Sequence, residues 1–129
     1  MDIEILYITL MTLFVMLLIF IYGVIRCKKV LKDPLLNYVP GTKIDGWSMS
    51  HFLLYAFLSY LFPTKWVYLF GAGAAWETFE YISELNPELT EGIGNCSTGE
   101  TWWFGQWSDI LMNSLGIATG KLLHHYIHR

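Results

Sequence analysis

The stretch Ile5–Ile25 reads ILYITLMTLFVMLLIFIYGVI, and this run decides which class of fold the chain belongs to. Only two threonines and one glycine interrupt its apolar side chains. At about 1.5 Å of rise per residue, a helix of this length crosses a hydrocarbon layer about 30 Å thick. The run is longer than the apolar core of a cleaved signal peptide, and its N-terminal flank (Asp2, Glu4) is acidic rather than basic. We therefore expect a retained transmembrane helix.

The composition of the whole chain indicates a membrane protein as well. Apolar residues make up 54% of the 129 residues and charged residues only 15%, whereas soluble domains carry about 25% charged residues. The net charge of −3 and the isoelectric point of about 5.7 do not suggest nucleic-acid binding, which usually needs a clear basic patch. The length is sufficient for one domain, so we expect residues 1–129 to form a single membrane domain.

Basic residues suggest an orientation for the first helix. The densest basic cluster follows the apolar run, and with Lys43 it gives five basic residues on that side (Arg26, Lys28, Lys29, Lys32, Lys43), against three on the other (Lys65, Lys121, Arg129). The positive-inside rule then places the loop 26–46 in the cytoplasm and the N-terminus outside. One feature opposes this orientation: Asn95-Cys96-Ser97 fits the acceptor pattern for glycosylation, which occurs on the lumenal side, but such triplets are common by chance.

The two cysteines, Cys27 and Cys96, give no readable disulfide framework and no CxxC metal motif. Cys27 lies beside the predicted membrane edge and is a candidate for lipidation. An uninvolved thiol is the simpler interpretation.

Three further helices are expected, over residues 47–62, 66–85 and 108–127. Pro63-Thr64-Lys65 forms a tight turn, so the first two of these make an antiparallel hairpin. The small residues Gly71–Ala75 fit ordinary close packing, and Gly116 and Gly120 form a small-xxx-small pair. The predicted fold is therefore all-α, an integral membrane bundle of about four helices.

The ends of the last helix carry aromatic and histidine residues. The polar, glycine-rich loop 86–106 closes with Trp102 and Trp103, which, with Trp107, resemble an aromatic belt at the membrane interface. The three C-terminal histidines can bind metal, but we interpret them as a solvated polar end.

Several polar side chains interrupt the predicted membrane helices. Each ionisable group in a bilayer costs roughly 2.5–3.5 kcal/mol on insertion scales. They occur as pairs that share one helix face because their spacing is three or four residues: His51 with Tyr55, Glu77 with Glu80, and Asp109 with Asn113.

These polar pairs also share one depth. His51 lies about one turn after its helix begins, Glu77 and Glu80 lie one to two turns before theirs ends, and Asp109 and Asn113 occupy the first two turns of the last helix. Carboxylates bind hard cations such as Ca²⁺ or Mg²⁺, and a histidine or carboxylate can transfer protons. The alternative is that groups near an interface simply reach water, and that Asp109 complements the positive end of its helix.

Between Gly46 and Gly120 the chain carries ordered motifs: His51, WETFE at 76–80, ETWW at 100–103, then Asp109, Asn113, Gly116 and Gly120. Their order resembles the membrane core of base-exchange phosphatidylserine synthases. The pattern DxxxNxxGxxxG is also similar to that of VanZ-like membrane proteins. The interval between Asp109 and Asn113 matches the VanZ-like pattern. The resemblance implies a divalent cation, calcium in the synthases, held by Glu77, Glu80 and Asp109. It implies catalytic roles for His51 and Glu77.

Our leading hypothesis is a site that acts on or binds a phospholipid head group, as a head-group transferase would, with Asn113 and Tyr55 contacting the substrate. The second is a non-catalytic VanZ-like module that binds lipid, helix partners or another copy of itself. A third is a small oligomeric channel or proton path, which needs a continuous polar pore. The apolar far halves of the helices 47–62 and 66–85 disfavour this third hypothesis.

Overall fold

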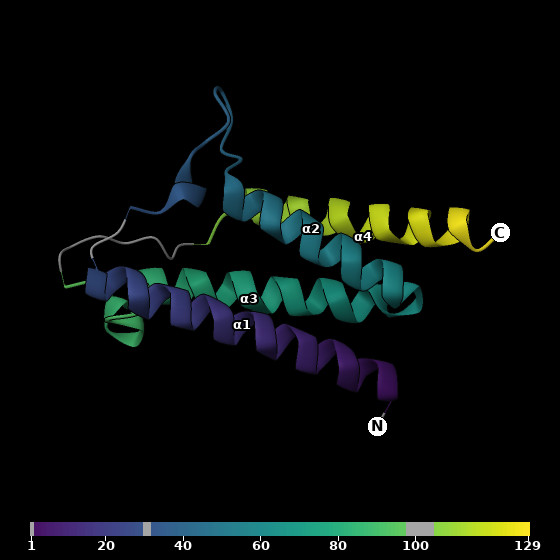
Figure 1. Ribbon diagram of the computed structural model, residues 1–129, viewed down its shortest axis with the longest axis horizontal. Helices are drawn as coiled ribbons and strands as arrows, with labels where there is room; N and C mark the ends of the chain where they lie inside the picture. The colour runs from purple at the N-terminus through teal and green to yellow at the C-terminus, as the bar shows by residue number, and fades with distance from the viewer. Residues whose placement is uncertain (1, 30–31, 98–104) are drawn as a thin grey trace. The chain divides into compact units, whose positions relative to one another are not determined.

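The computed structural model describes residues 2–29, 32–97 and 105–129, which are almost entirely helical (Figure 1). The α-helices are α1 (Ile3–Lys29), α2 (Gly46–Leu61), α3 (Trp66–Leu85) and α4 (Trp107–Ile127). Within these ranges the connections contain three short 3-10 helices, Pro34–Leu36, Pro63–Lys65 and Pro87–Thr90. No strand occurs in these described ranges, so the all-α prediction is confirmed. Trp102 and Trp103, predicted as interface residues, lie outside the described residues.

The helix boundaries follow from local signals in the sequence. Asp45 caps α2, because its carboxylate accepts a hydrogen bond of 2.9 Å from the backbone N–H of Ser48. The same helix ends just before Pro63, which cannot donate a backbone hydrogen bond. In α1 the helix continues past the apolar run to Lys29, since arginine and lysine are good helix formers.

Only α1 is by itself long and apolar enough to cross a membrane, among the residues described. A signal sequence near an N-terminus would have the same properties. The helices α2 and α3 reach this threshold only together, with a bend of 120° between them, as in a broken span or a re-entrant loop. The structure therefore supplies one candidate span, or two if the bent pair counts as one.

The chain divides into two compact units, and the division falls inside α3. The first unit contains Met1–Pro34 and Thr78–Gly105, and the second contains Leu35–Glu77 and Gln106–Arg129. Each unit is held together in its own way, and each is described separately below.

In the second unit α2 packs closely along α4 (Figure 1). A Cβ atom on Gly116 would collide with the carbonyl oxygen of Phe52, and one on Gly120 with that of Ala56. The hydroxyl of Ser59 adds a hydrogen bond of 2.9 Å to the carbonyl oxygen of Ile117. The small-xxx-small pair thus brings two backbones together, as such pairs do between membrane helices.

In the first unit a disulfide bond joins Cys27, in the last turns of α1, to Cys96, with their Cα atoms 5.0 Å apart. The interpretation of Cys27 as an uninvolved or lipidated thiol is therefore wrong. Its sulfur is already bonded, and two cysteines separated by 69 positions carry no sequence signal that would reveal their pairing.

The disulfide adjoins a polar cluster at the end of α1. The Tyr22 hydroxyl donates a hydrogen bond of 2.9 Å to Asp33, and a guanidinium nitrogen of Arg26 lies 3.5 Å from the other carboxylate oxygen of Asp33. Arg26 is 5% exposed. The basic cluster that follows the apolar run therefore includes one charge that is paired and buried.

The segment that carries Cys96 is a tight turn. The carbonyl oxygen of Thr90 accepts hydrogen bonds from the backbone N–H groups of Ile93, Gly94 and Asn95. The side-chain amide of Asn95 donates to the Thr90 hydroxyl over 2.7 Å. Gly92 has a φ of 77°, which glycine adopts without strain. The amide of the apparent glycosylation acceptor is therefore engaged inside the turn.

Candidate functional site

His51 lies at the centre of the polar groups of the second unit. Its Nδ1 atom is 3.0 Å from the side-chain oxygen of Asn113 and 3.4 Å from a carboxylate oxygen of Glu77. Both neighbours are acceptors, so this geometry fits an imidazole protonated at Nδ1, with Nε2 left for another partner. Asn113 and Glu77 are 2% and 5% exposed, which makes this a buried polar contact between α2, α3 and α4.

Glu77 is also held by the start of α4. Its second carboxylate oxygen accepts a hydrogen bond of 3.3 Å from the backbone N–H of Gln106, the residue that precedes the helix. The negative carboxylate thus lies at the N-terminal end of α4, where helix dipoles favour an anion. This contact could not be predicted from the sequence, because every residue except proline has a backbone N–H and the residue type does not show which one donates.

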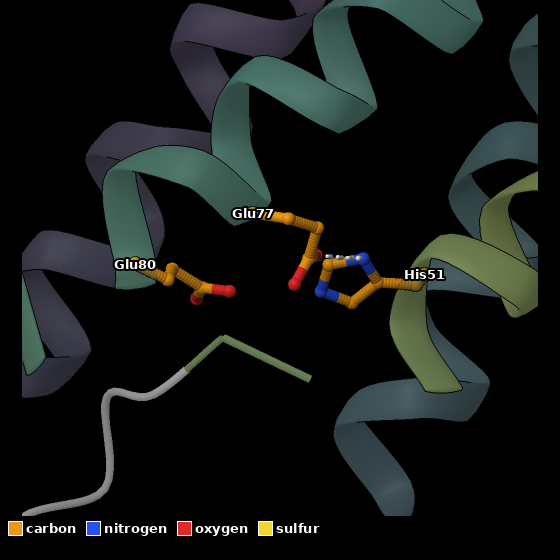
Figure 2. A group of neighbouring side chains, drawn as sticks. All are labelled: His51, Glu77 and Glu80. Carbon is orange, nitrogen blue, oxygen red and sulfur yellow. Dashed lines mark ion pairs between the residues drawn. The ribbon is translucent and has the colours of Figure 1, made fainter. Parts of the chain in front are cut away.

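Glu80 lies one turn beyond Glu77 on α3. Figure 2 shows the Glu80 carboxylate pointing toward the space between the Glu77 carboxylate and the His51 ring. One ligand atom from each of these three residues lies within 4.8 Å of the others, so together they can hold a metal ion. We call these three residues the His51 group. One imidazole nitrogen and two carboxylate oxygens are donors that divalent cations accept in proteins.

Asp109 does not belong to the His51 group in the part of the chain that the structure describes. Its carboxylate instead accepts a hydrogen bond of 2.5 Å from the hydroxyl of Ser48, and it is 4% exposed. The backbone N–H of Ser48 in turn donates to Asp45. Asp109 of α4 therefore contacts α2, the helix that carries His51. Its partner there is Ser48, about one turn before His51.

Asp45 and Ser48 were missed by the sequence analysis. Asp45 is 3% exposed, and one of its carboxylate oxygens has no hydrogen-bond partner within the described ranges. Two signals were available: Asp45 stands in the preferred position for a helix cap, and Ser48 lies three residues before His51, on the same face of the helix.

Tyr55 and Asn113 converge on Gly73 of α3. A Cβ atom at Gly73 would lie 2.8 Å from the Asn113 amide nitrogen and 2.9 Å from the Tyr55 hydroxyl. Gly71, by contrast, has no atom within 4 Å of that position. Gly73 therefore provides space for two of the predicted substrate-binding side chains, a role more specific than ordinary packing.

The predicted residues thus form one set around His51, while Asp109 lies apart from it and pairs with Ser48. His51, Glu77 and Asn113 contact one another directly, Glu80 completes the metal-binding geometry, and Tyr55 meets Asn113 beside Gly73. Glu100 and the paired tryptophans of the sequence motif lie outside the described residues.

Comparison of the chain with family models, curated proteins and solved structures finds no match. The resemblance to VanZ-like proteins and to phosphatidylserine synthases stays a hypothesis based on the order of the motifs.

Proposed function

We propose that this chain is a multi-pass membrane protein that uses the His51 group to hold a divalent cation, and with it the head group of a phospholipid. The observation that carries the proposal is the convergence of the three donor atoms of His51, Glu77 and Glu80 within 4.8 Å. The hydrogen bond from His51 to Asn113 orients the imidazole within that group.

The distribution of side chains in the second unit supports a lipid environment. Its buried side chains include Ser59, Glu77 and Asn113, whereas large apolar side chains such as Leu53 and Val67 are 59% and 63% exposed. Soluble proteins rarely expose extensive apolar surface around a polar interior. In a membrane protein, however, ionisable groups face the interior of the bundle and mark its functional site.

Helix length supports several spans. At about 1.5 Å per residue, α3 and α4 reach about 30 Å, and α2 is somewhat shorter. In a bundle of such helices, the start of α2, the end of α3 and the start of α4 all lie at the same membrane surface. The His51 group then lies close to one membrane surface, within reach of phospholipid head groups.

The donors of the His51 group restrict the choice of cation. Carboxylate oxygens suit Ca²⁺ and Mg²⁺, whereas an imidazole ligand suits Zn²⁺ and other transition metals. Calcium is the cation that the family resemblance implies, and the histidine adds Zn²⁺ and Mn²⁺ to the candidates. A bound cation would offset the charge of the two carboxylates and attract the phosphate of a head group.

A transferase reaction would exchange one head-group alcohol for another. A new bond forms between the phosphorus and the incoming alcohol oxygen while the bond to the leaving alcohol breaks. In this reaction Glu77 and Glu80 would hold the cation without His51, so that Nε2 of His51 could accept the proton of the incoming hydroxyl and return it to the leaving oxygen, as a general base and then a general acid. Asn113 and Tyr55 would position the polar head group.

The first test combines lipid mass spectrometry of cells with Mn²⁺ binding to the purified protein in lipid nanodiscs. We expect Glu77→Gln and Glu80→Gln to weaken Mn²⁺ binding at least about tenfold, and to abolish any change in phospholipid classes that the wild type causes. Glu84→Gln is the matched control, because Glu84 is exposed on the same helix and lies outside the His51 group. Equal Mn²⁺ binding by all four proteins would refute the cation site.

A second candidate function is a non-catalytic VanZ-like module that binds lipid. Its support is the hydrogen bond of 2.5 Å between Ser48 and Asp109, which engages a predicted ligand with a neighbouring side chain. This candidate predicts that a phospholipid copurifies with the protein, while the phospholipid classes of cells stay the same with and without it.

A further inference from the structure

The disulfide between Cys27 and Cys96 carries information about the membrane topology. It joins the end of α1 to the connection between α3 and α4. Two segments linked in this way must lie on the same side of a membrane. Disulfides of this structural kind form and persist in oxidising compartments and are rare in the cytosol.

We propose that the Cys27 end of α1 and the connection that carries Cys96 face an oxidising, extracytoplasmic compartment, and that the N-terminus faces the cytoplasm. This orientation is the reverse of the one expected from the basic residues. It also implies that the His51 group meets phospholipid head groups of the extracytoplasmic leaflet. The assignment of the leaflet rests on the proposed function, whereas the side of the disulfide does not.

The charge bias is too small to oppose the disulfide. Arg26 belongs to the five basic residues that suggested a cytoplasmic loop, yet it is buried and its guanidinium lies 3.5 Å from Asp33. Without Arg26 the basic residues number four on one side and three on the other, which favours neither. A structural disulfide, which is rare in the cytosol, is the stronger constraint.

The disulfide also limits how α2 and α3 cross the membrane. If the bent pair were one broken span, Leu85 would leave on the side opposite to Gly46, and Cys96 could not reach Cys27. The pair must therefore return to the side where it began, either as two spans or as a re-entrant loop. Both arrangements place the start of α2, the end of α3 and the start of α4 on the side of the disulfide.

This connectivity places the candidate site near the membrane surface on the same side as the disulfide. His51 lies five residues after the start of α2, and Glu80 lies five residues before the end of α3. Both are thus within two turns of the same membrane surface as the disulfide. Head groups of the leaflet on that surface are the ones within their reach.

The test uses the full chain with an N-terminal epitope tag, in sealed vesicles whose cytoplasmic face is outermost. Thiols are first blocked with N-ethylmaleimide, and a polyethylene-glycol maleimide then counts the cysteines that reduction releases. We expect no mass increase before reduction and two steps after it. We expect added protease to remove the tag, and a membrane-impermeant reductant to release the thiols only after detergent is added.

Two results would overturn the proposal. The first is blocking of both thiols without reduction, which would mean that no disulfide forms in the cell. The second is a protected tag together with thiols that the impermeant reductant releases in intact vesicles. The double variant with Cys27→Ser and Cys96→Ser is the control for labelling, and it should show no mass steps. Neither readout depends on cation or lipid binding, so failure of the proposed function would leave this test intact.

Discussion

The two units of this chain place their polar residues in different ways. In the second unit, polar side chains meet between helices, where glycines allow a close approach, as Tyr55 and Asn113 do beside Gly73. In the first unit, they gather at the end of α1 around Asp33, next to a disulfide. The second unit holds His51, Glu77 and Asn113 of the candidate site, whereas the first holds the disulfide on which the proposed topology rests.

Removal of the disulfide should have the largest effect on stability. The double change of Cys27 and Cys96 to serine should lower the free energy of unfolding by about 2–4 kcal/mol, because the bond closes a long loop in the unfolded chain. Unfolding in detergent measures this loss, and reduction of the wild type should reproduce it. Mn²⁺ binding by the His51 group should persist, since none of its three ligands is a cysteine and two of them, His51 and Glu77, belong to the second unit. Loss of Mn²⁺ binding by a double serine variant whose stability is unchanged would contradict this prediction.

The contact between α2 and α4 should be the next most sensitive feature. Gly120→Ala forces a Cβ atom against the backbone carbonyl of Ala56, where the neighbouring group cannot easily move, so we expect a loss of about 1–3 kcal/mol. Gly71→Ala is the matched control, because the new methyl group there meets no atom within 4 Å and should be neutral or slightly stabilising. Thermal unfolding of both variants checks the difference. Equal unfolding temperatures would mean that the two helices are not in close contact.

Local features of the sequence were sufficient to predict the helices. The prediction 66–85 matches α3, and 47–62 differs from α2 by one residue at each end, because hydropathy and Pro63 act through neighbouring residues. The face shared by Glu77 and Glu80 could also be predicted, since spacing along one helix is a local property. These successes depend on regular geometry within a single element.

The remaining features depend on contacts between residues that lie far apart in the sequence. Ser48 shares a helix face with His51, but spacing along one helix does not reveal that its hydroxyl engages Asp109. Asp109 is thereby kept apart from Glu77 and Glu80, the other two predicted metal ligands. The pairing of Cys27 with Cys96 joins residues far apart in the chain and has no spacing signature. Even Gly73, which lies in a run of small residues, differs from Gly71 only through the side chains that reach it from other helices.

Gly73 provides the finest test of the site, because its substitution should disturb function more than folding. A methyl group at this position would lie 2.8 Å from the Asn113 amide nitrogen and 2.9 Å from the Tyr55 hydroxyl. Both atoms are at the ends of side chains and can shift by a few tenths of an ångström, so Gly73→Ala should cost about 1 kcal/mol or less in stability.

The shift of Asn113 would be transmitted to His51 through their hydrogen bond of 3.0 Å. An imidazole that loses its orienting partner binds a metal ion less tightly, by about 10–100-fold in other proteins. We therefore expect Gly73→Ala to weaken Mn²⁺ binding by about tenfold while the unfolding temperature changes little. Gly71→Ala again serves as the control, and equal Mn²⁺ affinity in the two variants would show that Asn113 does not orient His51 for metal binding. In that outcome the contact between His51 and Asn113 would be a feature of helix packing alone.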